Sequence, residues 1–319
     1  MIAVYPTASH TCLATEYRPR RELKSGEMTG AWHVELGDDM LTVKSQPKRV
    51  VPNRTKGTEF EGHAFFEGAS IRKFGGLYYF IYSSRNNHEL CYAISKYPDR
   101  GYKYGGTVIS NGDVGLNGSK KKVALTGNNH GSVEKVGDKY FILYHRMTDK
   151  STYSRQACAE QVKIEDDGSI KQVEMTSCGL NGAPLKAEGE YPAAIACNLY
   201  NGKMPHVANG KSGKRVPYIT KSNGVWVIAD IRDATVIGYK YFLFNDACCI
   251  SLMLRGNFNG TVCLFTETEG SPICKMPVKA EAGYKKFEFP RISLQGVHSV
   301  YLKFTGNGNA ELSAFEFKK

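Results

Sequence analysis

Residues 60–84, FEGHAFFEGASIRKFGGLYYFIYSS, decide how the rest of the chain is interpreted. Ser70–Lys73 and Leu77–Ser84 have the composition of strands, and the glycine pair between them is typical of a tight hairpin turn. The same design recurs about 62 residues later, in Gly131–Lys135 and Lys139–His145. Two similar hairpins at this spacing predict stacked β-units of the kind that form a propeller.

Glu67 is the candidate chemical centre of this stretch. It lies between Phe66 and Gly68, where its carboxyl group would be partly desolvated and its pKa raised toward that of a useful general acid. An exposed turn glutamate is the alternative interpretation, because most carboxylates are solvated surface groups. His130 ends a long polar loop, residues 111–130, and its context leaves a functional and a structural role equally open.

Composition predicts an all-β chain with almost no helix. The 319 residues include 19 Tyr, 15 Phe and 33 Gly, and the glycines separate short aromatic or β-branched runs. The net charge of +11 comes from scattered basic residues without a nucleic-acid-binding motif, so it predicts a solvated basic surface rather than a nucleic-acid partner.

The cysteines and the apolar segments bear on the compartment. Nine cysteines without metal-ligand spacing indicate buried free thiols in a reducing compartment. No run of about 20 apolar residues could span a membrane. The N-terminus lacks the apolar core of a signal peptide, so the chain as given is expected to be cytoplasmic, although a missing upstream segment could have carried a signal.

Turn signals predict two domains: residues 1–177 as a partial β-propeller, residues 178–193 as a linker, and residues 194–319 as a β-sandwich. In the first, Ala3–Tyr5 and Thr11–Thr15 are candidate short strands, Ala31–Leu36 and Met40–Lys44 form a predicted hairpin, and Ile170–Met175 is a predicted closing strand. The expected sandwich strands are Val225–Ile231, Tyr239–Phe244, Cys248–Leu254, Gly260–Glu267, Lys285–Pro290, Ser299–Thr305 and Glu311–Phe317.

Phe66–Lys73 followed by Leu77–Ser84, and then Gly127–Ser132, resemble glycoside hydrolase family 43 over about residues 30–190. That family contains five-bladed propellers that act as β-xylosidases, α-L-arabinofuranosidases and arabinanases. The resemblance implies that Glu67 is the general acid and that Phe66, His130 and Arg155 contact the substrate. It also implies that His130 lies beside a metal ion or an ordered water.

Two of these implied roles have alternatives. The planar fork of Arg155 suits sugar hydroxyls and a carboxylate, but a surface salt bridge would use it equally well. A single histidine suits a hard cation weakly, so calcium is allowed at His130 and not required, and no other cofactor is expected.

The C-terminal part is similar to a family 6 carbohydrate-binding module, with Gly296–Phe304 as its best-matching segment. Exposed aromatic side chains are expected to stack on sugar rings, and the candidates are Tyr218, Trp226 and Tyr284. A purely structural sandwich that supports the propeller is the alternative.

The base aspartate of family 43, and the second aspartate that tunes its acid, are not recognisable in this chain. The sequence therefore predicts a truncated propeller of two good blades and a partial one, completed by residues 1–30 or by a second copy of the chain. An inverting mechanism would then take its base from Glu16, Glu22, Asp38 or Asp39, or from the partner chain.

The expected function is hydrolysis of xylose- or arabinose-containing hemicellulose, with Glu67 as general acid. One alternative is a non-catalytic carbohydrate-binding protein that has lost its base. A scaffold or assembly module is a third interpretation.

Overall fold

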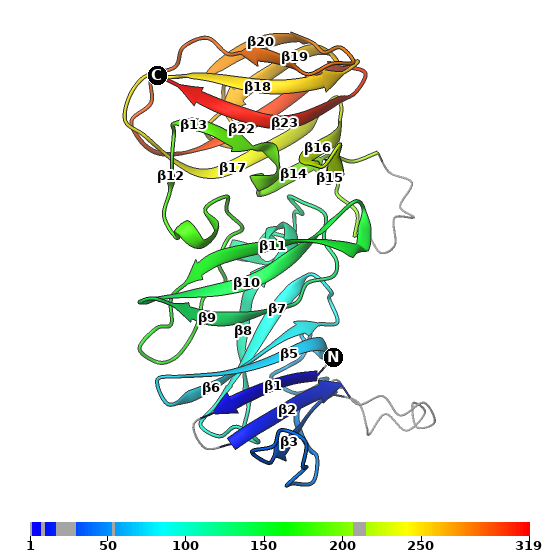
Figure 1. Ribbon diagram of the computed structural model, residues 1–319, viewed down its shortest axis with the longest axis vertical. Coiled ribbons are helices and arrows are strands. Elements are labelled where there is room, and N and C mark those ends of the chain that lie inside the picture. The colour runs from blue at the N-terminus through cyan, green and yellow to red at the C-terminus, as the bar shows by residue number, and fades with distance from the viewer. Residues whose placement is uncertain (1, 8–9, 17–29, 53–54, 207–214) are drawn as a thin grey trace. The chain divides into compact units, whose positions relative to one another are not determined.

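The computed structural model describes residues 2–7, 10–16, 30–52, 55–206 and 215–319. It is 56% strand and 4% helix, which confirms the all-β prediction (Figure 1). The helices within these ranges are four short 3₁₀ turns: η1 (Asn111–Asp113), η2 (Leu116–Gly118), η3 (Gly179–Asn181) and η4 (Ala193–Ile195). Among the described residues, no helix has the length and apolar character needed to cross a membrane.

The chain forms two compact units. The first contains residues 1–111, 128–145 and 157–174, and the second contains residues 112–127, 146–156 and 175–319. The predicted domain boundaries, with a linker over residues 178–193, stay a prediction.

The first unit is built from antiparallel meanders, in which neighbouring strands follow one another along the chain (Figure 1). Two sheets have four strands each, and a third has the order β11-β10-β9, of which residues 146–156 belong to the second unit. The strands are β1 (Ile2–Thr7), β2 (His10–Glu16), β3 (Gly30–Leu36) and β4 (Lys48–Pro52); β5 (Phe65–Phe74), β6 (Leu77–Ser84), β7 (Glu89–Ser95) and β8 (Lys103–Ser110); and β9 (Gly131–Val136), β10 (Lys139–Thr148) and β11 (Ser151–Val162).

The two predicted hairpins are confirmed as β5–β6 and β9–β10. The turn between β5 and β6 uses two glycines with positive φ, +54° at Gly75 and +84° at Gly76. This is the backbone that a tight turn between two twisted strands requires, and glycine adopts it at the least steric cost. Side chains of the first two sheets pack together in one core that includes Val51, Phe65 and Phe80.

Two predicted strands are wrong. Met40–Lys44 does not pair as a strand beyond an isolated bridge between Leu36 and Val43, and β3 pairs instead with β4. The reason is burial: Leu41 is 84% exposed and Val43 58% exposed, whereas Val51 of β4 is fully buried.

Ile170–Met175, the expected closing strand, forms only a single bridge, between Ile164 and Ile170. Its backbone N–H groups find other acceptors. The Ile170 N–H donates to the hydroxyl of Tyr92, at 2.8 Å, and the Val173 N–H donates to the carbonyl of Val108, at 2.9 Å.

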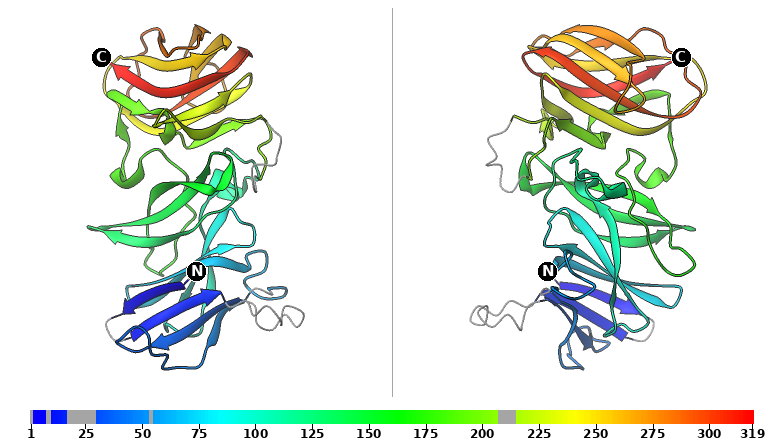
Figure 2. Two further views of the ribbon diagram at one scale, coloured as in Figure 1. Left: turned by 45° about the vertical axis from the view of Figure 1, so that its right-hand side comes forward. Right: turned by 180° about the vertical axis from the view of Figure 1, so that it is seen from behind.

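The second unit contains a β-sandwich of two six-stranded sheets that face each other (Figure 2). One sheet has the order β12-β17-β22-β19-β20, with β14 also paired to β17, and the other has the order β15-β16-β23-β18-β21, with β13 also paired to β23. The strands are β12 (Leu185–Lys186), β13 (Gly189–Pro192), β14 (Asn198–Asn201), β15 (Tyr218–Ser222), β16 (Val225–Ile231), β17 (Thr235–Phe244), β18 (Cys249–Gly256), β19 (Asn259–Phe265), β20 (Cys274–Lys279), β21 (Lys285–Glu288), β22 (Gly296–Asn307) and β23 (Ala310–Lys318).

Both sheets contribute to one apolar core, in which Phe242, Phe304 and Phe315 are at most 1% exposed. All seven predicted sandwich strands are present, with ends that differ by a few residues. Arg146, buried in this unit, donates from Nη2 to the carbonyl of Ala194 at 2.7 Å and from Nη1 to the carbonyl of Ala196.

Candidate active site around Glu67

Two β-bulges flank Glu67 on β5. Phe65 pairs with Ser84 and Glu67 with Ser83, so Phe66 is an extra residue on the β5 side. A second extra residue follows between Glu67 and Ser70, where Gly68 has a φ of +72°. Bulges bend a strand and redirect the side chains beside them, so this irregular entry sets the direction of the Glu67 carboxylate and leaves Phe66 half-buried next to it.

Glu67 meets His130, the residue before β9. The two side chains form a hydrogen bond, with 2.9 Å between His130 Nε2 and Glu67 Oε1. The Glu67 side chain is 33% exposed and that of His130 only 13% exposed. A β-carbon on Gly68 would lie 2.8 Å from His130 Cδ2, closer than real contacts allow, so glycine is what lets the ring approach the strand.

The loop before β9 holds His130 in place. The Asn128 N–H donates to Asn87 Oδ1 at 3.2 Å, and Ser83 Oγ donates to Asn129 Oδ1 at 3.0 Å. The ring of His145 packs edge-to-face against that of His130, with 5.5 Å between their centroids. The imidazole beside Glu67 is therefore fixed from both the turn after β6 and strand β10.

Side-chain pairs between β5 and β9 continue away from this site. Ser70 Oγ donates to Ser132 Oγ at 2.7 Å, and Arg72 Nε donates to Glu134 Oε1 at 2.7 Å. We call these two pairs the β5–β9 seam. It fixes the strand that carries Glu67 against the strand that follows His130.

The arrangement suits acid catalysis. A carboxyl group that is one third exposed can reach a bound substrate, while a fixed imidazole at 2.9 Å orients it. The donor set fits a calcium ion poorly, because calcium takes six to eight oxygen ligands and His130 supplies one nitrogen that already contacts Glu67. Among the described residues, His130 is not part of any group of three or more His, Cys, Asp or Glu side chains that could hold a metal.

Arg155 lies on β11, in the part of the strand that belongs to the second unit. Its side chain is exposed, and Nε donates to the carbonyl of Thr152 at 3.4 Å. Its role at a sugar site stays a prediction.

The structure describes the side chains of two of the four candidate bases, Asp38 and Asp39. Glu22 and the side chain of Glu16 lie outside the described residues. Asp38 is exposed. The Asp39 carboxylate accepts hydrogen bonds from the hydroxyl and N–H of Thr42 and from the Leu41 N–H, and these lower its pKa to about 2. Such a weak base is poorly matched to activation of water near neutral pH.

The aromatic candidates of the sandwich occupy different places. Tyr218 lines a cavity of about 390 Å³ together with Lys150, Asp230, Arg255 and Glu311. Tyr284 is 37% exposed and lies under the Arg255 guanidinium, 4.9 Å from ring centroid to Cζ. Trp226 is half-buried and packs against the sandwich core.

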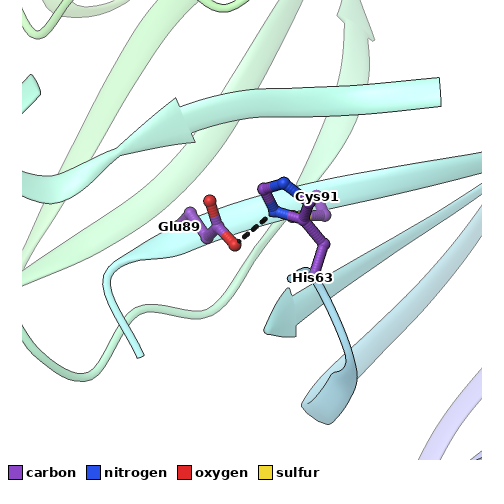
Figure 3. Close-up of side chains that lie close together, drawn as sticks. All are labelled: His63, Glu89 and Cys91. Carbon is purple, nitrogen blue, oxygen red and sulfur yellow. Dashed lines mark hydrogen bonds and ion pairs between the residues drawn. The ribbon is translucent and has the colours of Figure 1, made fainter. Parts of the chain in front are cut away.

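One cluster was not predicted from the sequence: His63, Glu89 and Cys91 lie close together in the first unit (Figure 3). Glu89 and Cys91 are two residues apart on one predicted strand, so the sequence places them on the same face. No sequence pattern around His63 predicts that it lies next to these two residues.

The chain is 39% identical to a xylosidase/arabinosidase of Thermoclostridium stercorarium, over 98% of its own length and 68% of that relative. The chain belongs to glycoside hydrolase family 43. This confirms the resemblance and the class of enzyme that it implies. No family model matches the chain.

Other proteins are less similar to this chain in sequence. An arabinoxylan arabinofuranohydrolase of Paenibacillus polymyxa is 24% identical over 88% of this chain and 43% of that protein. Among solved structures, a family 43 arabinoxylan arabinofuranohydrolase of Bacillus subtilis, in complex with cellotetraose, has a TM-score of 0.49 at 17% identity, covering 100% of this chain and 66% of the other. CsCBM6-3 of Clostridium stercorarium, in complex with cellobiose, has a TM-score of 0.36 at 17% identity, covering 43% of this chain and 98% of the other. This family 43 chain thus spans about two thirds of its T. stercorarium relative and less than half of the P. polymyxa one.

Proposed function

We propose that the chain hydrolyses terminal xylose or arabinofuranose from hemicellulose-derived oligosaccharides, with Glu67 as the general acid. The observation that carries the proposal is the Glu67–His130 contact, at 2.9 Å, between two bulges of β5. The named activities of the family members support the substrate class. Phe66, half-buried and adjacent to the acid along the chain, is proposed as an apolar contact for the sugar.

In this mechanism the Glu67 carboxyl group gives its proton to the glycosidic oxygen as the bond to the anomeric carbon breaks. As that bond breaks, a water attacks the anomeric carbon from the opposite face and gives its proton to a second carboxylate, so the configuration inverts. His130 keeps the Glu67 side chain directed toward the leaving oxygen. Arg155 is proposed as a sugar-hydroxyl donor.

The test uses aryl β-xylosides and aryl α-L-arabinofuranosides with the Glu67→Gln variant. Loss of a general acid is expected to lower kcat/KM by about 10²- to 10⁴-fold. The loss should be greater for the phenyl glycoside than for the para-nitrophenyl glycoside, because nitrophenolate leaves without help from an acid. Glu59→Gln, at an exposed position eight residues before Glu67, is the matched control.

A different pattern contradicts the assignment of the acid. Equal losses with both leaving groups would mean that Glu67 does not protonate the leaving oxygen. Unchanged turnover in the variant would remove the role altogether.

We propose that protonation of the glycosidic oxygen by Glu67 does not require calcium. An ion bound to His130 Nε2 would have to displace the Glu67 carboxylate from its hydrogen bond. Removal of calcium by EGTA is expected to leave kcat/KM unchanged, and a loss restored by calcium would contradict this.

We also propose that the sandwich binds carbohydrate, which the cavity beside Tyr218 supports. The Lys150 ammonium lies over the Tyr218 ring, 4.2 Å from its centroid, so we expect a sugar to use the tyrosine hydroxyl and the charged side chains as hydrogen-bond partners. Calorimetry with xylo-oligosaccharides should lose its signal in Tyr218→Ala and keep it in Trp226→Phe, which alters a side chain packed on the core. Binding that survives Tyr218→Ala would argue against this site.

A further inference from the structure

Three different ligand atoms meet beside β7. Glu89 and Cys91 are two residues apart on this strand, so their side chains emerge on one face. His63, from the turn before β5, lies over that face (Figure 3). His63 Nδ1 is 2.8 Å from Glu89 Oε1 and 3.8 Å from Cys91 Sγ, and all three ligand atoms lie within 4.8 Å of one another.

The surroundings hold the group in place. The Glu89 carboxylate accepts hydrogen bonds from Ser84 Oγ at 2.6 Å and from Asn86 Nδ2 at 2.8 Å. The ring of Tyr104 stacks on that of His63, with centroids 4.8 Å apart, and the Tyr104 hydroxyl lies 3.9 Å from Cys91 Sγ. Such outer contacts orient ligands in metal sites.

Access and charge are suitable for a cation. Glu89 is 4% exposed and Cys91 fully buried, whereas the His63 side chain is 32% exposed and opens the group to solvent. Glu89 supplies the negative charge that favours a cation at this buried position.

Spacing and chemistry select the kind of ion. Tetrahedral zinc with bonds of about 2.0–2.3 Å places its ligand atoms about 3.3–3.8 Å apart. The 3.8 Å between His63 Nδ1 and Cys91 Sγ lies in this range, whereas the 2.8 Å between His63 Nδ1 and Glu89 Oε1 has to lengthen by about 0.5 Å, because the metal takes the place of that hydrogen bond. Imidazole, carboxylate and thiolate together are a donor set for zinc rather than for calcium or magnesium.

We propose that His63, Glu89 and Cys91 bind a thiophilic divalent cation of the Zn²⁺ type, through Nδ1, a carboxylate oxygen and Sγ. The fourth ligand is water, entering from the exposed side of His63, or the Thr107 hydroxyl, 3.8 Å from Cys91 Sγ. Binding replaces the Cys91 thiol proton, which leaves to solvent, and the proton that His63 Nδ1 donates to Glu89, which leaves to solvent or is replaced by one on Nε2.

This site is separate from the proposed acid, because neither Glu67 nor His130 supplies a ligand. Its test therefore does not depend on hydrolysis, and either proposal can fail alone.

The experiment is a titration of the reduced, metal-free full chain with Co²⁺, followed by displacement with Zn²⁺. One equivalent of Co²⁺ should produce the near-ultraviolet charge-transfer absorption of a cobalt–thiolate bond, and Zn²⁺ should abolish it. Cys91→Ser should remove this absorption. His63→Gln, at a half-buried position that tolerates substitution better, should weaken Co²⁺ binding by at least about tenfold.

Two control variants separate this site from other thiols and from the proposed active site. Cys249→Ser and His130→Gln should keep the absorption and the affinity of the unaltered protein. Absence of a charge-transfer band, or a band that persists in Cys91→Ser, overturns the proposal. Unchanged affinity in His63→Gln does so as well.

Discussion

Glu89→Gln should destabilise the protein in a way that depends on pH. The Glu89 carboxylate is buried and accepts hydrogen bonds from His63, Ser84 and Asn86. Its pKa falls from 4.5 to about 2, because these hydrogen bonds outweigh the opposing effect of burial. At about 1.4 kcal/mol per pKa unit, this corresponds to about 3 kcal/mol of folding free energy that belongs to the ionised form.

The sign follows from the two partners. A lowered carboxyl pKa stabilises the fold above pH 4.5, and this contribution is lost as the pH falls toward about 2. The pKa of His63 is raised above 6.5 by its hydrogen bond to Glu89, so its contribution is complete below pH 6.5 and disappears as the pH rises through the folded value. The variant should differ most from the unaltered protein between pH 4.5 and 6.5.

Urea unfolding in the presence of EDTA measures the difference, since the chelator removes any bound cation. Between pH 4.5 and 6.5 the unfolding free energy of Glu89→Gln should be about 3 kcal/mol lower than that of the unaltered protein. The difference between the two proteins should become smaller below and above this pH range. Glu288→Gln removes the same charge from an exposed position of β21 and should change stability by at most about 0.5 kcal/mol. A gap that stays constant from acid to alkaline pH would refute the electrostatic reasoning.

Three other substitutions test specific contacts. Gly68→Ala should lower the rate of hydrolysis by up to about 100-fold, because the added β-carbon displaces the His130 ring. In the control variant Gly75→Ala the added β-carbon meets no neighbour, so only about 1 kcal/mol of stability should be lost. Kinetics and denaturation of both variants measure these effects. Arg146→Met removes the donor of the buried Ala196 carbonyl, whereas the Ala194 carbonyl keeps a second donor, Gln156 Nε2 at 3.1 Å. The substitution should cost about 2 kcal/mol in urea unfolding, and a loss near zero would contradict this. Tyr82→Phe removes the hydroxyl that donates at 2.8 Å to a backbone carbonyl and should lower the unfolding free energy by about 1 kcal/mol, so unchanged stability would count against that bond.

Local chemistry predicts the fold well where pattern and burial agree. Leu77–Ser84 is predicted and observed as the same strand because its aromatic run is buried along nearly its whole length. Prediction fails where the turn is correctly identified but the segment after it is not the one that becomes buried. The turn at Gly37 forms, yet Leu41 and Val43 stay exposed and β4 takes the place of the expected strand.

The site shows the same division. Glu67 and His130 can be named from the sequence through the family resemblance, but the second bulge and the close approach at Gly68 depend on the register of β5 against β6. No local pattern encodes that register. The His63 cluster depends on a turn folding over a strand 26 residues away, so it becomes visible only in three dimensions.

The β5–β9 seam joins positions that correspond in the two hairpins, because both of its side-chain pairs are 62 residues apart. A serine meets the equivalent serine, and an arginine meets a glutamate at the equivalent position. If one hairpin were duplicated, the serine contact would form at once between the copies, while the charged position would set two like charges against each other. Replacement of the charged residue in one copy by a residue of opposite charge turns that repulsion into an ion pair. It also determines which copy can pack beside which. Such a contact gives a ring of repeated units a simple route by which to lengthen through gene duplication.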